Sequence, residues 1–514
     1  MRELSLVKKA PANIIWNFLG QGWLIILALI TTPFIVRRLG TSLYGIYVLI
    51  SVVIDYFSFL QLGMGAAAIR YISLYLAKKD LEKVREIFWT GMVSHFFLGL
   101  LGVALIIVLS GTFVYRFLHI TSSQVDIALV ALRIGSVGFL VSLLSGMAAG
   151  LIRTLGRFDI LNIMGILLGS IQVGATVVVL VLGFSLKEIV IANLAVQLMG
   201  LLGYTYYGIK GMPEVKKWAW SKEALIKLLT FGGFVTVSGI VGPILTNIEK
   251  IFLTTLRSVT NLTYYAVPFS LINRLSVIPV SFSSVLFPLF SYYQGEGGSG
   301  LTKELHFRSV LYLSLIYSVP FLFIIFYGGA FLSWWMGEDF ALHSTTILML
   351  LGLAGFINAS AYPSITALQG LGKPQWPALF HVLETVLYIP IGYFLIARYG
   401  GVGAAGAWLL RVLVDTVLLH MATCHVLGES VTRWYGRLIY HGFLPVVMMA
   451  CLFWGLQRLN LTLLHPLNIL GVTAVVTLYG GILWKWVLDR STRQRIVASF
   501  RRIKDEYHPH GSPP

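Results

Sequence analysis

The amino-acid sequence predicts an all-α membrane protein that crosses the bilayer about fourteen times. Three observations predict this fold class: the composition, a series of long apolar runs, and the distribution of Lys and Arg between those runs. Hydrophobic residues make up 57% of the 514 residues and charged residues only 11%, whereas soluble domains carry about 25% charged residues. A chain this apolar cannot bury its surface in a water-soluble core, so lipid must surround most of it.

Each apolar run is long enough to cross the hydrocarbon core as a helix, which takes about 20 residues. The runs are too long for barrel strands, and only helices and closed barrels satisfy the backbone in lipid. The first run is also too long for a signal peptide, and no small-residue cleavage site follows it, so we interpret it as a retained helix. The predicted spans are 13–36, 43–68, 87–109, 127–150, 160–183, 188–209, 228–253, 264–291, 307–331, 343–368, 376–397, 403–426, 441–459 and 467–488.

The Lys and Arg residues alternate between the two sides of these spans. With the N-terminus placed in the cytoplasm, 27 of the 38 fall in cytoplasmic segments, 7 fall in outer segments and four lie within spans. A wrongly placed helix would destroy this asymmetry, so it supports the number of spans and an orientation with both termini in the cytoplasm. It also explains most of the net charge of +17 without nucleic acid. We therefore expect a multi-pass protein of the cell (inner or plasma) membrane.

The chain lacks the motifs of a catalytic or cofactor-binding domain. Cys424 and Cys451 lie in apolar runs and form neither a disulfide framework nor a metal motif. Residues 401–406 match G-x-G-x-x-G, but no strand precedes them and no acidic residue follows about 20 residues later, so we expect no nucleotide site. A P-loop is also absent from the sequence. We expect a protein that is not an enzyme and that carries no cofactor or metal.

An internal repeat of six helices follows from pairs of similar segments. Leu155-Gly156 and Leu371-Gly372 are 216 positions apart, and Tyr44 and Tyr264, which open two spans, are 220 apart. Because six is even, both halves have the same orientation, and such parallel repeats enclose a cavity that opens alternately to each side in transporters. The predicted divisions are an N-terminal lobe at 1–211, a C-terminal lobe at 212–428, two further helices at 429–490 and a basic cytoplasmic tail at 491–514.

Asp55 and Arg274 lie well inside predicted spans, where ionisable side chains are costly and are functional candidates by default. They are 219 positions apart and therefore occupy nearly equivalent places in the two halves. They could face each other across the cavity, or they could form a salt bridge that only holds the halves together. The two interpretations are compatible, because a breakable pair between the halves could also act as a gate.

A second polar pair occurs at matching places in the two halves. Arg411 and Asp415 are four residues apart and share one face of the twelfth span. Their counterparts 218 positions earlier, in the sixth span, are Asn193 and Gln197. This match indicates polar faces directed into the cavity in both halves, although Arg411 and Asp415 could instead neutralise each other.

Two further pairs of ionisable residues lie in the second half. His381 and Glu384 are three residues apart on one face of the eleventh span. Either could carry a coupling proton, since histidine titrates near neutral pH, but a structural hydrogen bond explains them equally well. Glu249 and Lys250 lie near the outer end of the seventh span, where we expect a capping or interfacial role.

The sequence also contains several short motifs: PFIVRRLG at 33–40, LYGIY at 43–47, GMGAAAIRY at 63–71, the Leu-Gly turns at 155 and 371, and GVGAAG at 401–406. In these motifs the chain resembles the O-antigen and exopolysaccharide repeat-unit flippases, the polysaccharide biosynthesis proteins of the multidrug/oligosaccharidyl-lipid/polysaccharide exporter superfamily. The resemblance covers roughly residues 10–430. It implies two six-helix lobes around a central cavity and transport of a polyprenyl-diphosphate-linked oligosaccharide from the inner to the outer leaflet. Partners would include a glycan polymerase and glycosyltransferases.

Three alternatives stay open. A multidrug or cation antiporter of the same fold predicts an acidic cavity, whereas Arg274 and Arg411 make this one mixed or positive. In the related lipid II flippases, charged residues of helices one, two and eight line the cavity, but the first span here contains no charge until Arg37 at its end. A membrane enzyme of glycan assembly usually needs a sizeable outer loop, which this chain lacks.

Overall fold

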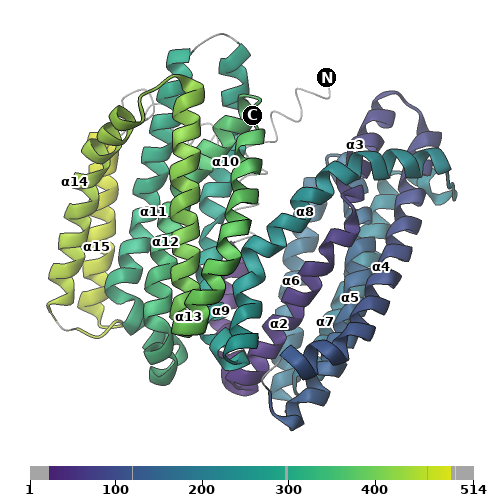
Figure 1. Cartoon of the computed structure of the whole chain (residues 1–514), viewed down its shortest axis with the longest axis horizontal. Coiled ribbons are helices and arrows are strands. Elements are labelled where there is room, and N and C mark those ends of the chain that lie inside the picture. Colours follow the sequence, from purple (N-terminus) through teal and green to yellow (C-terminus); the bar gives the residue numbers. More distant parts are fainter. Residues whose placement is uncertain (1–21, 118–119, 296–298, 460, 488–492, 494–514) are drawn as a thin grey trace, which may run out of the picture. The chain divides into compact units, whose positions relative to one another are not determined.

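The computed structural model describes residues 22–117, 120–295, 299–459, 461–487 and 493, and every regular element within them is a helix (Figure 1). Twelve of the described helices are long and apolar enough to cross a membrane. The chain divides into two compact units, and each is described by itself. The predicted fold class of an all-α polytopic membrane protein is confirmed.

The N-terminal unit contains the described residues up to Ser281 and the segment Pro377–Arg411. Its helices are Gly22–Leu39, α2 (Thr41–Phe57), η1 (Ser58–Gln61), α3 (Met64–Ala77), α4 (Leu81–Phe117), α5 (Ser122–Thr154), α6 (Phe158–Val181), α7 (Leu186–Gly211), η2 (Pro213–Lys216), α8 (Lys222–Leu256), α9 (Val259–Leu275) and the corresponding parts of α10 (Val277–Gly295) and α13 (Gln375–Leu427).

The C-terminal unit contains Phe282–Trp376 and the described chain from Val412 onward. Besides the remaining parts of α10 and α13, its helices are α11 (Ser299–Met336), α12 (Glu338–Gly370), α14 (Val431–Gln457), α15 (Pro466–Ile482) and η3 (Leu483–Val487). The start of the predicted first span and, apart from Arg493, the predicted basic tail at 491–514 lie outside the described residues. The division into lobes at 1–211 and 212–428 stays a prediction.

Two helices, α13 and α8, account for the difference between the twelve spans of the structure and the fourteen predicted spans. α13 leaves the helical conformation at Gly400 (φ 56°, ψ −130°), between the predicted spans 376–397 and 403–426. α8 contains the predicted span 228–253 and is not one of the twelve. The described helices therefore correspond in order to the fourteen spans read from the sequence.

Two spans that we predicted as continuous helices, 43–68 and 264–291, are interrupted. The first is divided into α2, η1 and α3, because Leu62 and Gly63 both adopt positive φ angles (47° and 60°) that no right-handed helix accommodates. The second is divided at Ser276 into α9 and α10. Pro279 explains this break, since it has no N–H to donate to the carbonyl four residues earlier.

α2 and α9 approach each other closely at Gly45 in the N-terminal unit. A Cβ atom at Gly45 would lie 2.0 Å from the carbonyl oxygen of Val259, closer than any real contact. In the same contact, the hydroxyl of Thr263 donates to the carbonyl of Thr41 at 2.6 Å. Glycine is therefore required here for the packing of two neighbouring helices.

Gly45→Ala is expected to lower the free energy of unfolding by about 1–3 kcal/mol, because the methyl group forces α2 away from α9. The matched control is Gly65→Ala in α3, where an added Cβ has no neighbour within 4 Å. This control should be neutral, or stabilising by up to about 1 kcal/mol, because alanine favours helix more than glycine does. Thermal unfolding of both variants in detergent tests the prediction, and equal stability of the two would contradict it.

α14 and α15 pack on α11 in the C-terminal unit around buried aromatic side chains. Trp434 of α14 is fully buried, and Tyr479 of α15 is 2% exposed. The hydroxyls of Tyr479 and Ser318 are 2.9 Å apart, and the hydroxyl of Tyr327 donates to Asn468 Oδ1 at 3.0 Å. The last two helices are therefore joined to α11 by a common core and by buried hydrogen bonds.

Candidate functional site

Glu249 of α8 is a fully buried carboxylate in the N-terminal unit. The hydroxyl of Tyr265 (α9) donates to its Oε1 at 3.1 Å, and the hydroxyl of Tyr388 (α13) donates to its Oε2 at 3.2 Å. A buried carboxylate is tolerated when its oxygens accept hydrogen bonds, so the two tyrosines explain how this charge is accommodated. The expected capping or interfacial role of Glu249 is therefore wrong.

Arg411 and Glu384, both on α13, extend this network. Nη1 of Arg411 lies 3.8 Å from Oε2 of Glu384, and the two side chains are only 14% and 3% exposed. The Arg411 guanidinium carbon is also 5.6 Å from the centre of the Tyr388 ring. Tyr388 thus contacts both the Glu249 carboxylate and the arginine that pairs with Glu384.

Lys250, the residue after Glu249, also interacts with carboxylates. Its Nζ donates to Asn247 Oδ1 at 2.6 Å and lies 4.7 Å from the centre of the Phe269 ring. It interacts electrostatically with Glu249 and with Asp55 of α2. Asp55 also contacts Asn247 and is exposed in the isolated chain.

The network therefore combines three carboxylates with two cations: Asp55, Glu249 and Glu384 with Lys250 and Arg411. Charges within membrane helices are costly unless they are paired, and such groups often mark transport pathways. Because each cation interacts with a carboxylate, an anionic substrate could compete for the cations. A carboxylate released in that way could bind a proton or a cation.

Arg274 lies at the end of α9, and its charge interacts with the hydroxyl of Tyr44 in α2. The ring centres of Tyr44 and Tyr47 are 6.2 Å apart. Asn193 Nδ2 of α7 donates to the Tyr47 hydroxyl at 3.3 Å. Arg274 and Asn193 are thus connected through two tyrosines of α2, whereas a direct pair of Arg274 with Asp55 stays a prediction.

Three further predicted site residues are Gln197, Asp415 and His381. Gln197 is exposed on α7, and its Oε1 lies against Gly138 of α5. Asp415 is buried in the C-terminal unit. His381 is half-buried on α13, and its carbonyl accepts from the hydroxyl of Thr385 at 2.7 Å. Their proposed roles in the cavity and in ion coupling stay predictions.

The sequence analysis missed the three neutral residues that hold this network: Asn247, Tyr265 and Tyr388. All three lie within apolar runs, where a tyrosine or an asparagine attracts little attention. The tyrosines could have been identified from the sequence, because a tyrosine hydroxyl in an apolar environment needs a hydrogen-bond partner. This requirement does not identify the partner, because Tyr388 lies 139 positions from Glu249.

Tyr388→Phe is expected to lower the free energy of unfolding by about 1.5–3 kcal/mol, because it removes one hydrogen bond to a buried carboxylate. The matched control is Tyr393→Phe on the same helix, since Tyr393 is 52% exposed. Thermal unfolding of the purified variants measures the difference. A loss no larger than that of the control would show that Glu249 does not depend on the Tyr388 hydroxyl.

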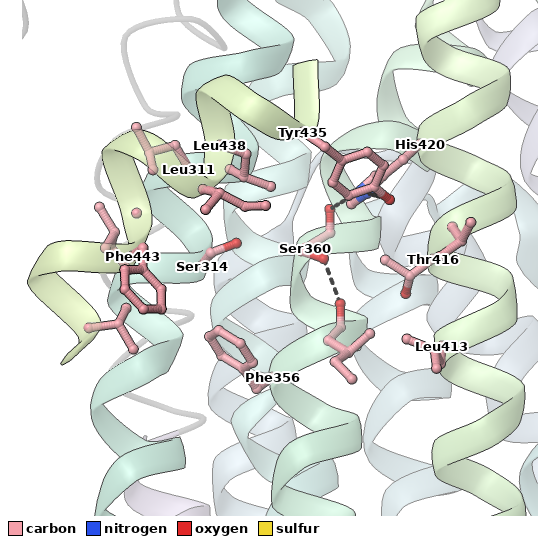
Figure 2. Close-up of a pocket in the computed structure, with 16 residues that line it drawn as sticks. Leu311, Ser314, Phe356, Ser360, Leu413, Thr416, His420, Tyr435, Leu438 and Phe443 are labelled. Atoms are coloured by element: carbon pink, nitrogen blue, oxygen red, sulfur yellow. Dashed lines mark hydrogen bonds between the residues drawn. The ribbon is translucent and has the colours of Figure 1, made fainter. Parts of the chain in front are cut away.

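The C-terminal unit contains an apolar pocket of about 410 Å³ between α11, α12, α13 and α14 (Figure 2). Its walls include Leu311, Phe356 and Phe443. Among its polar groups, His420 Nε2 donates to the Ser360 carbonyl at 3.1 Å, whereas the buried hydroxyl of Thr416 has no hydrogen-bond partner among the described residues. The other ring nitrogen of His420 is then the acceptor for the Tyr435 hydroxyl at 3.0 Å. Such a pocket suits a hydrocarbon chain.

Comparison with known families assigns the chain. Residues 11–294 match the model of the polysaccharide biosynthesis protein family. The chain belongs to this family. The match covers more than half of the sequence and includes the charged residues of α2, α8 and α9 described above.

Individual relatives agree with this assignment. A putative O-antigen transporter from Shigella flexneri is 24% identical over 419 residues, which is 81% of this chain and 97% of that protein. The structure of the lipid II flippase MurJ in an inward closed conformation aligns with a TM-score of 0.73 at 13% identity over 93% of this chain and 100% of that one. An inward-facing multidrug resistance MATE transporter of the MOP superfamily aligns with a TM-score of 0.69 at 14% identity over 81% and 98%. These structures show a shared fold.

Proposed function

We propose that this polysaccharide biosynthesis family member is a flippase for polyprenyl-diphosphate-linked oligosaccharides. It moves the lipid-linked unit from the cytoplasmic to the outer leaflet of the cell membrane by alternating access, and it is not an enzyme. The observation that carries the proposal is the set of basic residues inside the membrane helices of a family member: Lys250, Arg274 and Arg411.

The chemistry of the substrate explains why such residues are needed. A diphosphate and a sugar chain cannot enter hydrocarbon without hydrogen bonds and counter-charges. Basic side chains supply both, and arginine binds phosphate oxygens in a bidentate way. The apolar pocket of the C-terminal unit offers a separate surface for part of the polyprenyl chain.

The role of the predicted site residues follows from this proposal. Arg274 and Arg411 bind the diphosphate, while Asp55, Asn193, Gln197 and Asp415 contribute to the polar cavity and its gating. Glu384 binds a coupling ion when the substrate draws Arg411 away, and His381 is the alternative proton carrier. Glycosyltransferases would supply the substrate, and a glycan polymerase would receive it.

A multidrug or cation antiporter is the second candidate. Two observations favour it: the alignment with the MATE transporter and the carboxylates Asp55, Glu249 and Glu384. An exporter of cations needs acidic groups that are free to bind them, whereas Glu249 and Glu384 are already engaged by tyrosines and Arg411. A lipid II flippase is a third candidate of the same class.

Leaflet accessibility of the lipid-linked oligosaccharide tests the proposal. Cells with the chain, without it, and with it restored are treated with a membrane-impermeant reagent that modifies the glycan on the outer leaflet. Loss of outer-leaflet glycan without the chain, and recovery on restoration, is the expected result. Unchanged glycan together with increased sensitivity to cationic drugs would favour the antiporter, and accumulation of lipid II in the inner leaflet would favour the lipid II flippase.

A further inference from the structure

A second cavity of the C-terminal unit lies between α11 and α14 and has a charged end and an apolar end. Its volume is about 770 Å³. Glu304, Arg308 and Arg437 line one end, and Phe443 and Leu444 line the other. Arg437 and Leu444 are seven residues apart on α14, which corresponds to about 10 Å along the helix axis. The cavity therefore passes from charged to apolar over the distance that separates a phospholipid headgroup from its acyl chains.

The charged end is held together by one shared carboxylate. Arg308 Nε donates to Glu304 Oε1 at 2.7 Å, and Arg437 Nη2 donates to Glu304 Oε2 at 2.9 Å. The Arg437 guanidinium carbon also lies 4.0 Å from the centre of the Phe307 ring. The three charged side chains are 37–42% exposed, so a ligand can reach the outward sides of both guanidinium groups.

Among the described charged residues that line this end or interact with Glu429, the excess is one positive charge. Two more charged residues lie beside the cavity: Glu429, which is 3.6 Å from Arg437, and Lys303, which donates to the carbonyl of Gly428 at 3.1 Å. Together with Glu304, Arg308 and Arg437 they give three cations and two anions. One positive charge matches a phosphodiester, which carries one negative charge, better than a diphosphate, which carries more.

The apolar end is open to the lipid. Phe443 and Leu444 are 64% and 62% exposed, and Ile439 and Tyr440 on the same helix are 60% and 80% exposed. The cavity also shares Leu311, Ile439 and Phe443 with the apolar pocket of Figure 2. An acyl chain that follows α14 from the charged end therefore reaches the mouth of that pocket.

We propose that this cavity binds one anionic phospholipid, with its phosphodiester on Arg308 and Arg437 and an acyl chain along Phe443 and Leu444. Basic pockets between membrane helices on the cytoplasmic side bind anionic headgroups in this way. The ends of α11 and α14 that carry these arginines are on the side that the Lys and Arg distribution predicts to be cytoplasmic. A lipid at this position would form part of the wall of the apolar pocket.

Native mass spectrometry of the delipidated, purified full-length chain tests the site. Phosphatidylglycerol and phosphatidylcholine with identical acyl chains are titrated separately. Phosphatidylglycerol should bind at least about tenfold more tightly, and Arg308→Gln/Arg437→Gln should remove this preference. The control is Arg458→Gln, which removes one arginine from an exposed position 21 residues, or about 30 Å, from Arg437 at the other end of α14 and outside the cavity. It should change the affinity less than about twofold, because one distant exposed charge contributes little.

A second measurement does not depend on the stability of the double variant. Phe443→p-benzoylphenylalanine, in a chain that keeps both arginines, should cross-link phosphatidylglycerol and not phosphatidylcholine on illumination. Equal binding or cross-linking of the two lipids would overturn the proposal, as would an equal loss in Arg458→Gln. Displacement of phosphatidylglycerol by an equimolar polyprenyl diphosphate would also overturn it, because the cavity would then belong to the transported lipid.

Discussion

Arg411→Met is expected to lower the free energy of unfolding by about 3–5 kcal/mol. The substitution keeps an apolar side chain of similar length but takes the guanidinium away from Glu384, whose side chain is 3% exposed. Removing one partner of a buried ion pair leaves the other charge in a medium that solvates it poorly. Thermal and denaturant unfolding of the purified chain in detergent measure the loss.

Two further variants separate this effect from a general effect of charge. Arg398→Met removes an arginine from an exposed position on the same helix and should change stability by less than about 0.5 kcal/mol. Arg411→Met/Glu384→Gln removes both charges and should recover part of the loss, because the buried carboxylate is gone. A double variant as unstable as the sum of the single variants would show that Arg411 and Glu384 do not stabilise each other.

The number and order of the helices could be predicted because lipid imposes a length and a composition on each span. The interruptions of two spans could not, because they depend on single residues within continuous apolar runs. Pro279 is visible in the sequence, but a proline in a membrane helix produces either a kink or a break, and its surroundings decide which. Leu62 has a positive φ angle that no local rule assigns to leucine.

The site was predictable to the extent that charges stand out in apolar segments. Asp55, Arg274, Glu384 and Arg411 stand out in this way, but the pairing of Arg411 with Glu384 does not. A helix presents different residues to each neighbour, and the rotation that selects them is set by packing rather than by spacing along the chain. Arg411 illustrates this: the structure places its guanidinium 3.8 Å from Glu384, which lies 27 positions earlier, and nothing in the sequence spacing indicates that pair.

The two interrupted spans place Asp55 and Arg274 in different backbone surroundings. α2 passes directly into η1 after Phe57, and the amide of Ser58 donates to the carbonyl of Asp55, so the break at Leu62 and Gly63 lies seven residues beyond Asp55. α9 ends at Leu275, one residue after Arg274. Because Pro279 has no N–H, the carbonyl of Leu275 lacks its usual helical partner, which adds polar backbone beside the charge of Arg274.

Arg274→Ala should reduce the rate of lipid-linked oligosaccharide transport by about a hundredfold. This reduction corresponds to the loss of about 3 kcal/mol of interaction between the guanidinium and the diphosphate. The fold should be nearly unaffected, because Arg274 is only half-buried. A cation at the end of a helix contributes only about 0.3–1 kcal/mol through the helix dipole. The initial rate at which the substrate becomes accessible on the far side of proteoliposomes, together with the unfolding temperature, measures both effects.

Arg274→Lys and Arg398→Ala make this prediction specific. Lysine keeps the charge but loses the bidentate geometry toward phosphate, so Arg274→Lys should transport at a rate between those of the alanine variant and the unmodified chain. Arg398→Ala removes an exposed charge of the same unit and should transport normally. Normal transport by Arg274→Ala would remove Arg274 from the proposed site and leave Lys250 and Arg411 as the candidate ligands of the diphosphate. Loss of transport in all three variants would instead show that the rate depends on overall charge rather than on a contact made by Arg274.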